Sequence, residues 1–474
     1  MSADIVFVLG YFAVTAGIGA YLVKAQNSVA EFFVAKRELG VLLIIPLLFA
    51  EMIAGAGTVG NAADAFKYGI SSVWINWGMS IGVFMTIIFA TKFYRVAGVK
   101  MGVMSVPAAY EMRFDKKTRL VMMAILIVVY AILFALQPLA AAAIIAPMLG
   151  ISKAIVAWIM GLLFIYLTVS GGMRGLAWMN VLHSFVMYLG LGIVAYVVVK
   201  ASGGWGGMQA ALPAKSFNFG QPNWLTVNGW WLGSALGMLC SSSLIGCIFG
   251  GKSLKAINQA SWLAGFFVLI FALFPALIGM GGKVLLPDVA RNGILYAAAN
   301  SVGPGFGVLA AMGVLAAIMS TAPALLLVTV TTITRDFYKL VKQDVDDEQE
   351  MKFARITTIV LGIICTFIGL NVTSILSQVA GAFQIRAIAG LVIMVAMVWP
   401  RVDARAAFWS MLTGGIVAAG WHFAGNPYMT SLWPSLIVGV PVLVILTLMA
   451  KRPVSEGFKR FADAAKEAEA EGIL

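Results

Sequence analysis

The sequence is poor in charged residues, which make up only 11% of its 474 positions, whereas hydrophobic residues make up 61%. A soluble chain of this length carries roughly a quarter charged residues to cover its surface. Long polar linkers that would divide the chain into several soluble domains are also missing. These absences argue against an ordinary soluble protein and indicate one that has lipid as its solvent.

Side chains that carry metal or redox chemistry are equally scarce. The chain has two histidines and three cysteines, and Cys240, Cys247 and Cys365 each lie inside an apolar stretch without metal-type spacing. This spacing predicts neither a disulfide framework nor a zinc site. A Walker-type nucleotide loop and an acid pair with catalytic spacing are missing too, so we expect neither ATP-driven work nor an enzyme.

Long apolar segments fill most of the chain, and its 50 glycines and 13 tryptophans are typical of closely packed transmembrane helices. A membrane-spanning helix needs about 20 apolar residues. The sequence predicts an all-α polytopic membrane protein with about 13 transmembrane helices. We expect spans near 4–23, 41–66, 71–97, 119–147, 151–171, 176–199, 229–250, 256–283, 303–334, 353–371, 375–399, 406–424 and 431–450.

The distribution of lysine and arginine predicts the orientation, because basic residues gather in cytoplasmic loops. With the N-terminus outside and the C-terminus cytoplasmic, only six of the 32 basic residues fall on the outer side. The net charge of +12 is therefore a topology signal and does not indicate nucleic-acid binding. We expect a multi-pass protein of a bacterial inner membrane.

Two of the predicted spans contain glycines in their middle. The second reads FAEMIAGAGTVGNAAD (49–64) and the seventh GSALGMLCSSSLIG (233–246), five helices later. Unwound helices at matching positions of two inverted repeats mark the substrate site of many transporters. We therefore predict a 5+5 inverted repeat with one leading and two trailing helices. The expected units are 1–40, 41–199, 200–228 (an extracellular loop), 229–400, 401–450 and 451–474.

Two hydroxyls lie next to each other in the ninth span. Ser320 and Thr321 follow one turn after Ala317, which places two hydroxyls and a backbone carbonyl on one face. Sodium prefers oxygen ligands of this kind. The alternative is that both hydroxyls only hydrogen-bond to the preceding turn of their own helix.

Five segments together resemble the sodium:solute symporter family, over roughly residues 5 to 420. They are EFFVAKRELG (31–40), FAEMIAGAGTVG (49–60), SGGMRGLAWMN (170–180), FGGKSLKA (249–256) and AAIMSTAPALLLVTVTTITRDFY (316–338). The last resembles the family's core helix 8 most specifically. The resemblance implies a leucine-transporter-type fold and sodium-driven uptake by alternating access.

The resemblance also implies a sodium site between core helices 1 and 8. Its ligands would be the backbone carbonyls of Ala50, Ile53 and Ala317 and the hydroxyls of Ser320 and Thr321. Family members with a second sodium use an aspartate and two further hydroxyls, where this chain has Asn180, Pro323 and Ala324. We therefore expect Na+ as the coupling ion, and one sodium at most.

Ionisable residues inside a span are functional candidates because their desolvation is costly. Glu51 lies beside the expected break of core helix 1, and Arg386 lies in core helix 10, where a guanidinium can hold a carboxylate. Both can equally serve a structural ion pair, and His183 on core helix 5 is either structural or a proton carrier. The expected substrate-binding residues are Glu51, Ala54, Gly55, Thr58, Asn76, Gln137, Cys240, Ser241 and Arg386.

The sequence thus favours a sodium-coupled symporter for a small polar solute, an organic anion (monocarboxylate) or an amino acid. A proton-coupled symporter that uses Glu51 or His183 is one alternative. A non-transporting solute sensor is another, although the short segment after the last span argues against an attached signalling domain. The expected partners are the solute and the lipid bilayer, with the chain a monomer or a homodimer and no nucleic acid bound.

Overall fold

The computed structural model describes residues 10–11, 13–15, 17, 38–338, 342, 346–372, 375–450 and 452–473, without the side chains of 50–51, 170–177 and 347. From Val41 onward the elements in this part are helices. They are α3 (Val41–Gly55), η2 (Ala56–Gly60), α4 (Asn61–Tyr68), η3 (Gly69–Val73), α5 (Trp74–Phe89), α6 (Thr91–Lys100), α7 (Val106–Arg113), α8 (Lys116–Leu149), α9 (Lys153–Ala201), α10 (Gly204–Ala211), η4 (Ala214–Phe217), α11 (Trp224–Met238), α12 (Ser242–Gly250), α13 (Leu254–Phe271), α14 (Leu273–Leu285), η5 (Arg291–Gly293), α15 (Ile294–Ser301), α16 (Pro304–Thr331), η6 (Thr332–Tyr338), α18 (Asp347–Gly369), α19 (Ile375–Val398), α20 (Ala404–Phe423), α21 (Leu432–Leu448) and α22 (Glu456–Ala470).

The structure confirms an all-α membrane protein. Among the described residues, eight helices are long and apolar enough to span a membrane, and Lys153–Val169 and Leu432–Leu448 are shorter apolar stretches. The count of 13 spans is not confirmed. The predicted spans 41–66 and 71–97 share one apolar stretch, Met52–Phe89, and most of the predicted leading span lies outside the described residues.

Helix α9 differs from its prediction because two expected spans are joined without a loop. Its 49 residues correspond to about 74 Å at 1.5 Å per residue, more than twice the roughly 30 Å of hydrocarbon. Its two apolar stretches, Lys153–Val169 and Trp178–Ala201, nevertheless match the predicted spans 151–171 and 176–199. The difference from the prediction is that α9 continues as one helix between these two segments.

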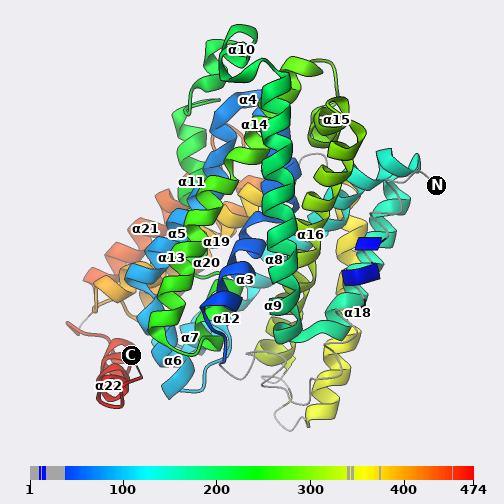
Figure 1. Cartoon of the computed structure of the whole chain (residues 1–474). Coiled ribbons are helices and arrows are strands. Elements are labelled where there is room, and N and C mark those ends of the chain that lie inside the picture. The colour runs from blue at the N-terminus through cyan, green and yellow to red at the C-terminus, as the bar shows by residue number, and fades with distance from the viewer. Residues whose placement is uncertain are drawn as a thin grey trace.

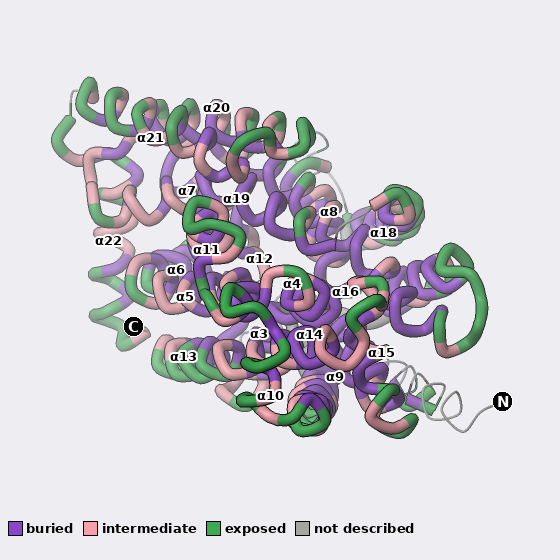
Figure 2. Tube along the Cα trace, turned by 90° about the horizontal axis from the view of Figure 1, so that it is seen from above, coloured by how far each residue is buried: buried purple, intermediate pink, exposed green. Residues whose placement is uncertain are grey.

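The helices form one bundle around a buried centre. Seen from above, α20 and α21 lie along one edge, and α3, α11, α16 and α19 contribute buried segments near the middle (Figure 2). One end of the bundle carries α10, and the opposite end carries α6, α7 and α22 (Figure 1). These last helices bring charged side chains such as Lys92, Arg113 and Arg460 to that end.

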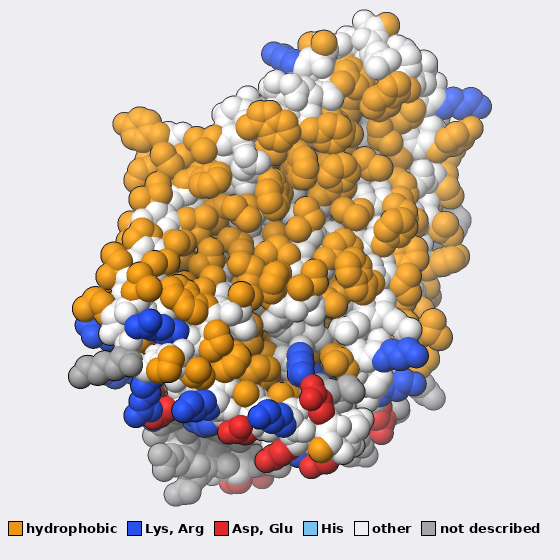
Figure 3. All heavy atoms as spheres, turned by 90° about the vertical axis from the view of Figure 1, so that its left-hand side faces the viewer, with side chains coloured by type: hydrophobic (Ala, Val, Ile, Leu, Met, Phe, Trp, Pro, Cys, Tyr) orange, Lys and Arg blue, Asp and Glu red, His pale blue; other side chains and the backbone are white. Residues whose placement is uncertain are grey.

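The outer surface is that of a membrane protein. A broad hydrophobic band covers the face shown in Figure 3, and lysine, arginine, aspartate and glutamate gather below it. Large apolar side chains on this kind of surface are exposed, for example Tyr196 at 68% and Phe367 at 62%. Exposure of so many apolar groups is stable only in contact with lipid.

Candidate functional site

The first break lies in the helix formed by α3 and η2. Ala54 leaves helical geometry with φ 45° and ψ −173°, and the chain continues as the π-helical turn Ala56–Gly60. A non-glycine residue in this region is strained by about 1–2 kcal/mol. Side chains from other helices compensate: Gly55 N–H donates to Gln137 Oε1 (3.2 Å), and Asn76 Nδ2 donates to Gly57 O (3.2 Å).

The second break lies between α11 and α12. Residues Leu239, Cys240 and Ser241 interrupt the helix. Tyrosine hydroxyls form hydrogen bonds with backbone groups at this interruption. Tyr94 Oη donates to Leu239 O (2.9 Å), and the backbone N–H of Ser242 donates to Tyr130 Oη (2.7 Å). Both breaks that the glycine pattern predicts are therefore present, although in the second helix the interruption falls after Gly237 and not on a glycine.

A buried cavity of about 40 Å³ lies between the two breaks. Among the expected site residues, Ile53, Ala54, Asn76, Gln137, Ser241, Thr321 and Arg386 line it. Apolar side chains such as Met52, Leu133 and Phe383 complete the walls. The cavity holds only a few waters' worth of space, so this conformation encloses the site tightly.

Three expected substrate residues do not line this cavity. The Thr58 hydroxyl donates back to Ala54 O (3.1 Å). Gly55 packs against Ala140 and Gln137. Cys240 is fully buried behind the cavity, with Sγ 3.6 Å from Arg386 O. The Glu51 side chain lies outside the described residues.

Among the described residues that line the cavity, Arg386 is the one with a charged side chain. It is 1% exposed, and its guanidinium lies over the rings of Tyr130 and Phe383 at 5.5 and 5.2 Å from their centroids. Nη1 donates to Tyr130 Oη (3.0 Å), while Nε has no hydrogen-bond partner among the described residues. No ion pair of Arg386 with an acidic side chain is found in the described part of the chain. A desolvated guanidinium in this state favours an anionic ligand.

Tyr130 is the site residue that sequence reasoning missed. Its buried hydroxyl accepts from Arg386 and from Ser242 N–H and lies 3.4 Å from Ser241 Oγ. It thus joins three helices, α8, α12 and α19, at one atom. The available signal was its position seven residues before Gln137, because that spacing puts both side chains on one face of α8.

The predicted cation ligands of α16 lie together. Ser320 Oγ donates to Ala317 O (2.8 Å), Thr321 Oγ1 donates to the same carbonyl (2.9 Å), and the two hydroxyls are 3.4 Å apart. Ile53 lines the same cavity as Thr321, and Ile53 O accepts from Ala56 N–H. For Ala50, only the backbone within α3 is described. The neutral oxygens suit a hard monovalent cation, although the same hydrogen bonds satisfy the alternative of structural back-bonding.

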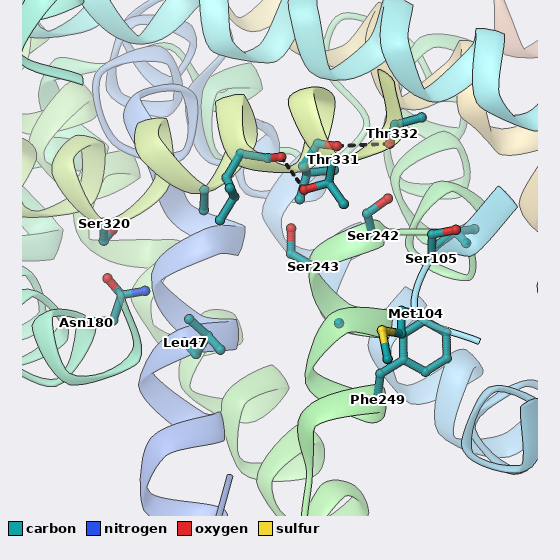
Figure 4. Close-up of a pocket in the computed structure, with 15 residues that line it drawn as sticks. Leu47, Met104, Ser105, Asn180, Ser242, Ser243, Phe249, Ser320, Thr331 and Thr332 are labelled. Carbon is teal, nitrogen blue, oxygen red and sulfur yellow. Dashed lines mark hydrogen bonds between the residues drawn. The ribbon is translucent and has the colours of Figure 1, made fainter. Parts of the chain in front are cut away.

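A second cavity of about 100 Å³ continues from Ser320 toward the end of the bundle that carries α7. Figure 4 shows hydroxyls of Ser242, Ser243, Thr331 and Thr332 around it, with Asn180 on the opposite side near Ser320. Asn180 Oδ1 and Ser243 Oγ are buried there without a hydrogen-bond partner among the described residues. The cavity therefore places several hydroxyl groups and an amide between Ser320 and the end of the bundle that carries α7.

His183 lies away from both cavities. It is fully buried on α9, and Tyr11 Oη forms a hydrogen bond with its Nδ1. The two rings also meet edge to face. The imidazole of His183 therefore connects α9 to Tyr11.

Comparison with known proteins agrees with this geometry. The model of the sodium:solute symporter family matches residues 32–414. The chain belongs to the sodium:solute symporter family. It is therefore a transporter of a family of sodium-coupled symporters and not an enzyme.

Similar proteins cover nearly the whole chain. The sodium/proline symporter of Escherichia coli (strain K12) is 22% identical, over 94% of this chain and 93% of its own length. An osmoregulated proline transporter of Bacillus subtilis (strain 168) is 22% identical, over 97% and 98%. A solved Na+-coupled sialic acid symporter in a substrate-bound outward-open state superposes with a TM-score of 0.78 at 18% identity, over 94% and 97%. This last likeness confirms the leucine-transporter-type fold of the chain.

Proposed function

We propose that this symporter imports a small carboxylate-bearing solute, an organic anion or an amino acid, together with one sodium ion. The observation that carries the proposal is Arg386, whose desolvated guanidinium lines the cavity between two broken helices. Its Nε–H has no hydrogen-bond partner among the described residues. A carboxylate there would form charge-assisted hydrogen bonds and neutralise a costly buried charge. Proline and sialic acid, the solutes for which similar transporters are named, both carry a carboxylate group.

Sodium would bind beside this solute. Ser320, Thr321 and the Ala317 carbonyl on α16, with the carbonyls of Ile53 and Ala50 on α3, would form one neutral oxygen site. Such a site would tie α3 to α16, and loss of the ion into the second cavity would release that contact. Rocking of one helix group against another around a fixed site is the general mechanism of such folds.

Two further features belong to this proposal. The positions that would hold a second ion are Pro323 and Ala324, which have no side-chain oxygen, and an amide, Asn180, replaces the carboxylate. The distribution of basic residues supports a cytoplasmic location for the end that carries α6, α7 and α22. In this orientation, the second cavity would be the path by which sodium leaves toward the cytoplasm.

Uptake into proteoliposomes tests the proposal. We would impose an inward sodium gradient, with an equal potassium gradient as the control, and supply labelled small monocarboxylates and amino acids. Uptake of a carboxylate driven by sodium, and lost in Ser320→Ala, supports the proposal. Uptake that follows a pH gradient and ignores sodium contradicts it and makes Glu51 the candidate proton carrier.

A further inference from the structure

A pocket rich in arginine lies where α7, α20 and the segment before α22 meet. It has a volume of about 430 Å³. Its charged lining residues are Arg113, Arg401, Arg405, Arg452 and Arg460, with Asp403 and Glu456 as acidic neighbours. Asp403 caps α20 by accepting from Ala406 N–H (2.9 Å), and Glu456 pairs with Arg452. The pocket therefore holds an excess of three positive charges.

Two of these guanidinium groups have a buried N–H without a partner among the described residues, namely Nε of Arg113 and Nε of Arg401. Arg113 is 1% exposed, and its Nη atoms donate to Ala396 O (2.8 Å) and Ser455 Oγ (3.0 Å). Burial and the charge of Arg460 lower the pKa of Arg113 to about 10. An anion in the pocket would offset the repulsion between these guanidinium groups.

An apolar groove continues from this pocket, because Ala404 and Arg405 line both. The groove has a volume of about 930 Å³ and runs along α20 as far as Ala419, against α8. That stretch corresponds to about 22 Å at 1.5 Å per residue, more than half of a roughly 30 Å hydrocarbon layer. Trp409, near the charged end, is 46% exposed, and Ile416, farther along, is 63% exposed. The arginine pocket is therefore joined to a long apolar groove on the lipid-facing surface of the protein.

We infer that this combined surface binds one anionic phospholipid, with its phosphate in the arginine pocket and one acyl chain in the groove. Basic pockets between transmembrane helices at the cytoplasmic side are suited to anionic headgroups. A soluble anion would use the arginines alone, whereas the groove that begins at Arg405 adds a site for hydrocarbon. Because Ser455 and Gly457 line the pocket, the bound lipid would also contact the segment that leads into α22 and hold it against α7 and α20.

Native mass spectrometry of the delipidated full chain tests this inference, with phosphatidylglycerol and phosphatidylcholine of identical acyl chains as probes. We expect one phosphatidylglycerol to bind at least about tenfold more tightly than phosphatidylcholine. The double variant Arg405→Ala/Arg460→Ala should weaken that binding about 30-fold, since each basic side chain near an anionic headgroup contributes a factor of roughly five. The matched control, Lys352→Ala/Arg355→Ala, removes the same charge from exposed positions on α18 and should change nothing.

The acyl-chain half of the site has its own variant pair. A Cβ at Gly415 meets Ile125 at 3.4 Å, an ordinary contact, whereas a Cβ at Gly420 meets nothing within 4 Å. Gly415→Leu should place its side chain in the groove and lower phosphatidylglycerol binding about tenfold. Gly420→Leu should bind as the wild type does. Equal binding of the two lipids, or unchanged binding in Gly415→Leu, would overturn the inference. Glycerol phosphate that competes as well as the lipid would also overturn it, because it would show a site for a soluble anion.

Discussion

Different kinds of side chain bind the unwound backbone of the two broken helices. At the first break, amide side chains of Gln137 and Asn76 hold the unwound backbone, and the hydroxyls of α16 lie beside it. At the second break, a phenol, Tyr130, holds the backbone and also contacts a guanidinium. Among the described side chains, neutral oxygens lie at the first break and a buried positive charge lies beside the second. The surroundings of the first interrupted helix therefore favour a cation, and those of the second favour an anion.

The largest expected effect comes from the second break. Arg386→Gln should reduce uptake of the carboxylate solute about 100-fold or more, because two charge-assisted hydrogen bonds of about 1.5 kcal/mol or more are lost. The melting temperature of the solute-free protein should not fall, since the substitution removes a buried charge that has no acidic partner among the described residues. The exposed Arg355→Gln serves as the control in both assays. A variant that still transports the carboxylate normally would remove Arg386 from the substrate site.

Substitutions beside the first break should change the sodium dependence of uptake and not the preference for a charged solute. Thr321→Ala should raise the sodium concentration for half-maximal uptake about tenfold, because one oxygen ligand is lost. Thr329→Ala is a matched control, since Thr329 Oγ1 makes the same kind of bond, to Leu325 O (2.8 Å), farther along α16. If both variants have the same sodium dependence, the hydroxyl pair is structural.

A smaller effect is expected from the hydroxyl that joins α8, α12 and α19. Tyr130→Phe should raise the KM for the carboxylate about five- to tenfold with little change in the maximal rate, because Arg386 loses the bond that orients it. Tyr110→Phe removes another buried hydroxyl, which donates to Ala389 O (2.8 Å) outside the cavity, and should leave KM unchanged. An equal loss of maximal rate in both variants would indicate damage to packing alone.

The smallest effect concerns the number of ions. The dependence of uptake on sodium should have a Hill coefficient of about 1 in the wild type and in Asn180→Asp, because a new carboxylate alone cannot bind a second ion without the missing hydroxyls at 323 and 324. Tracer fluxes of sodium and solute provide the independent ratio. A ratio of two sodium ions per solute would contradict the single-site account.

Much of this arrangement follows from local sequence. Length of apolar runs predicts the spans, and glycines predict the two breaks, because those signals concern single helices. The contact of Tyr130 with Arg386 joins residues 256 positions apart, so no local pattern contains it. The same holds for the arginine pocket, whose members come from α7, the start of α20 and the tail. Thr58 and Cys240 are predicted substrate residues because of their neighbours in the chain; here the Thr58 hydroxyl donates to Ala54 O, and Cys240 Sγ lies 3.6 Å from Arg386 O.

The most direct test of the central claim is thermal stabilisation of the purified protein by a panel of small carboxylates and amino acids. Each solute is compared with its amide analogue, in sodium or potassium, on the wild type and Arg386→Gln. The account predicts that at least one carboxylate stabilises the wild type only in sodium, and that neither its amide nor the variant shows the effect. Equal stabilisation by the amide, or of Arg386→Gln by the carboxylate, would contradict it.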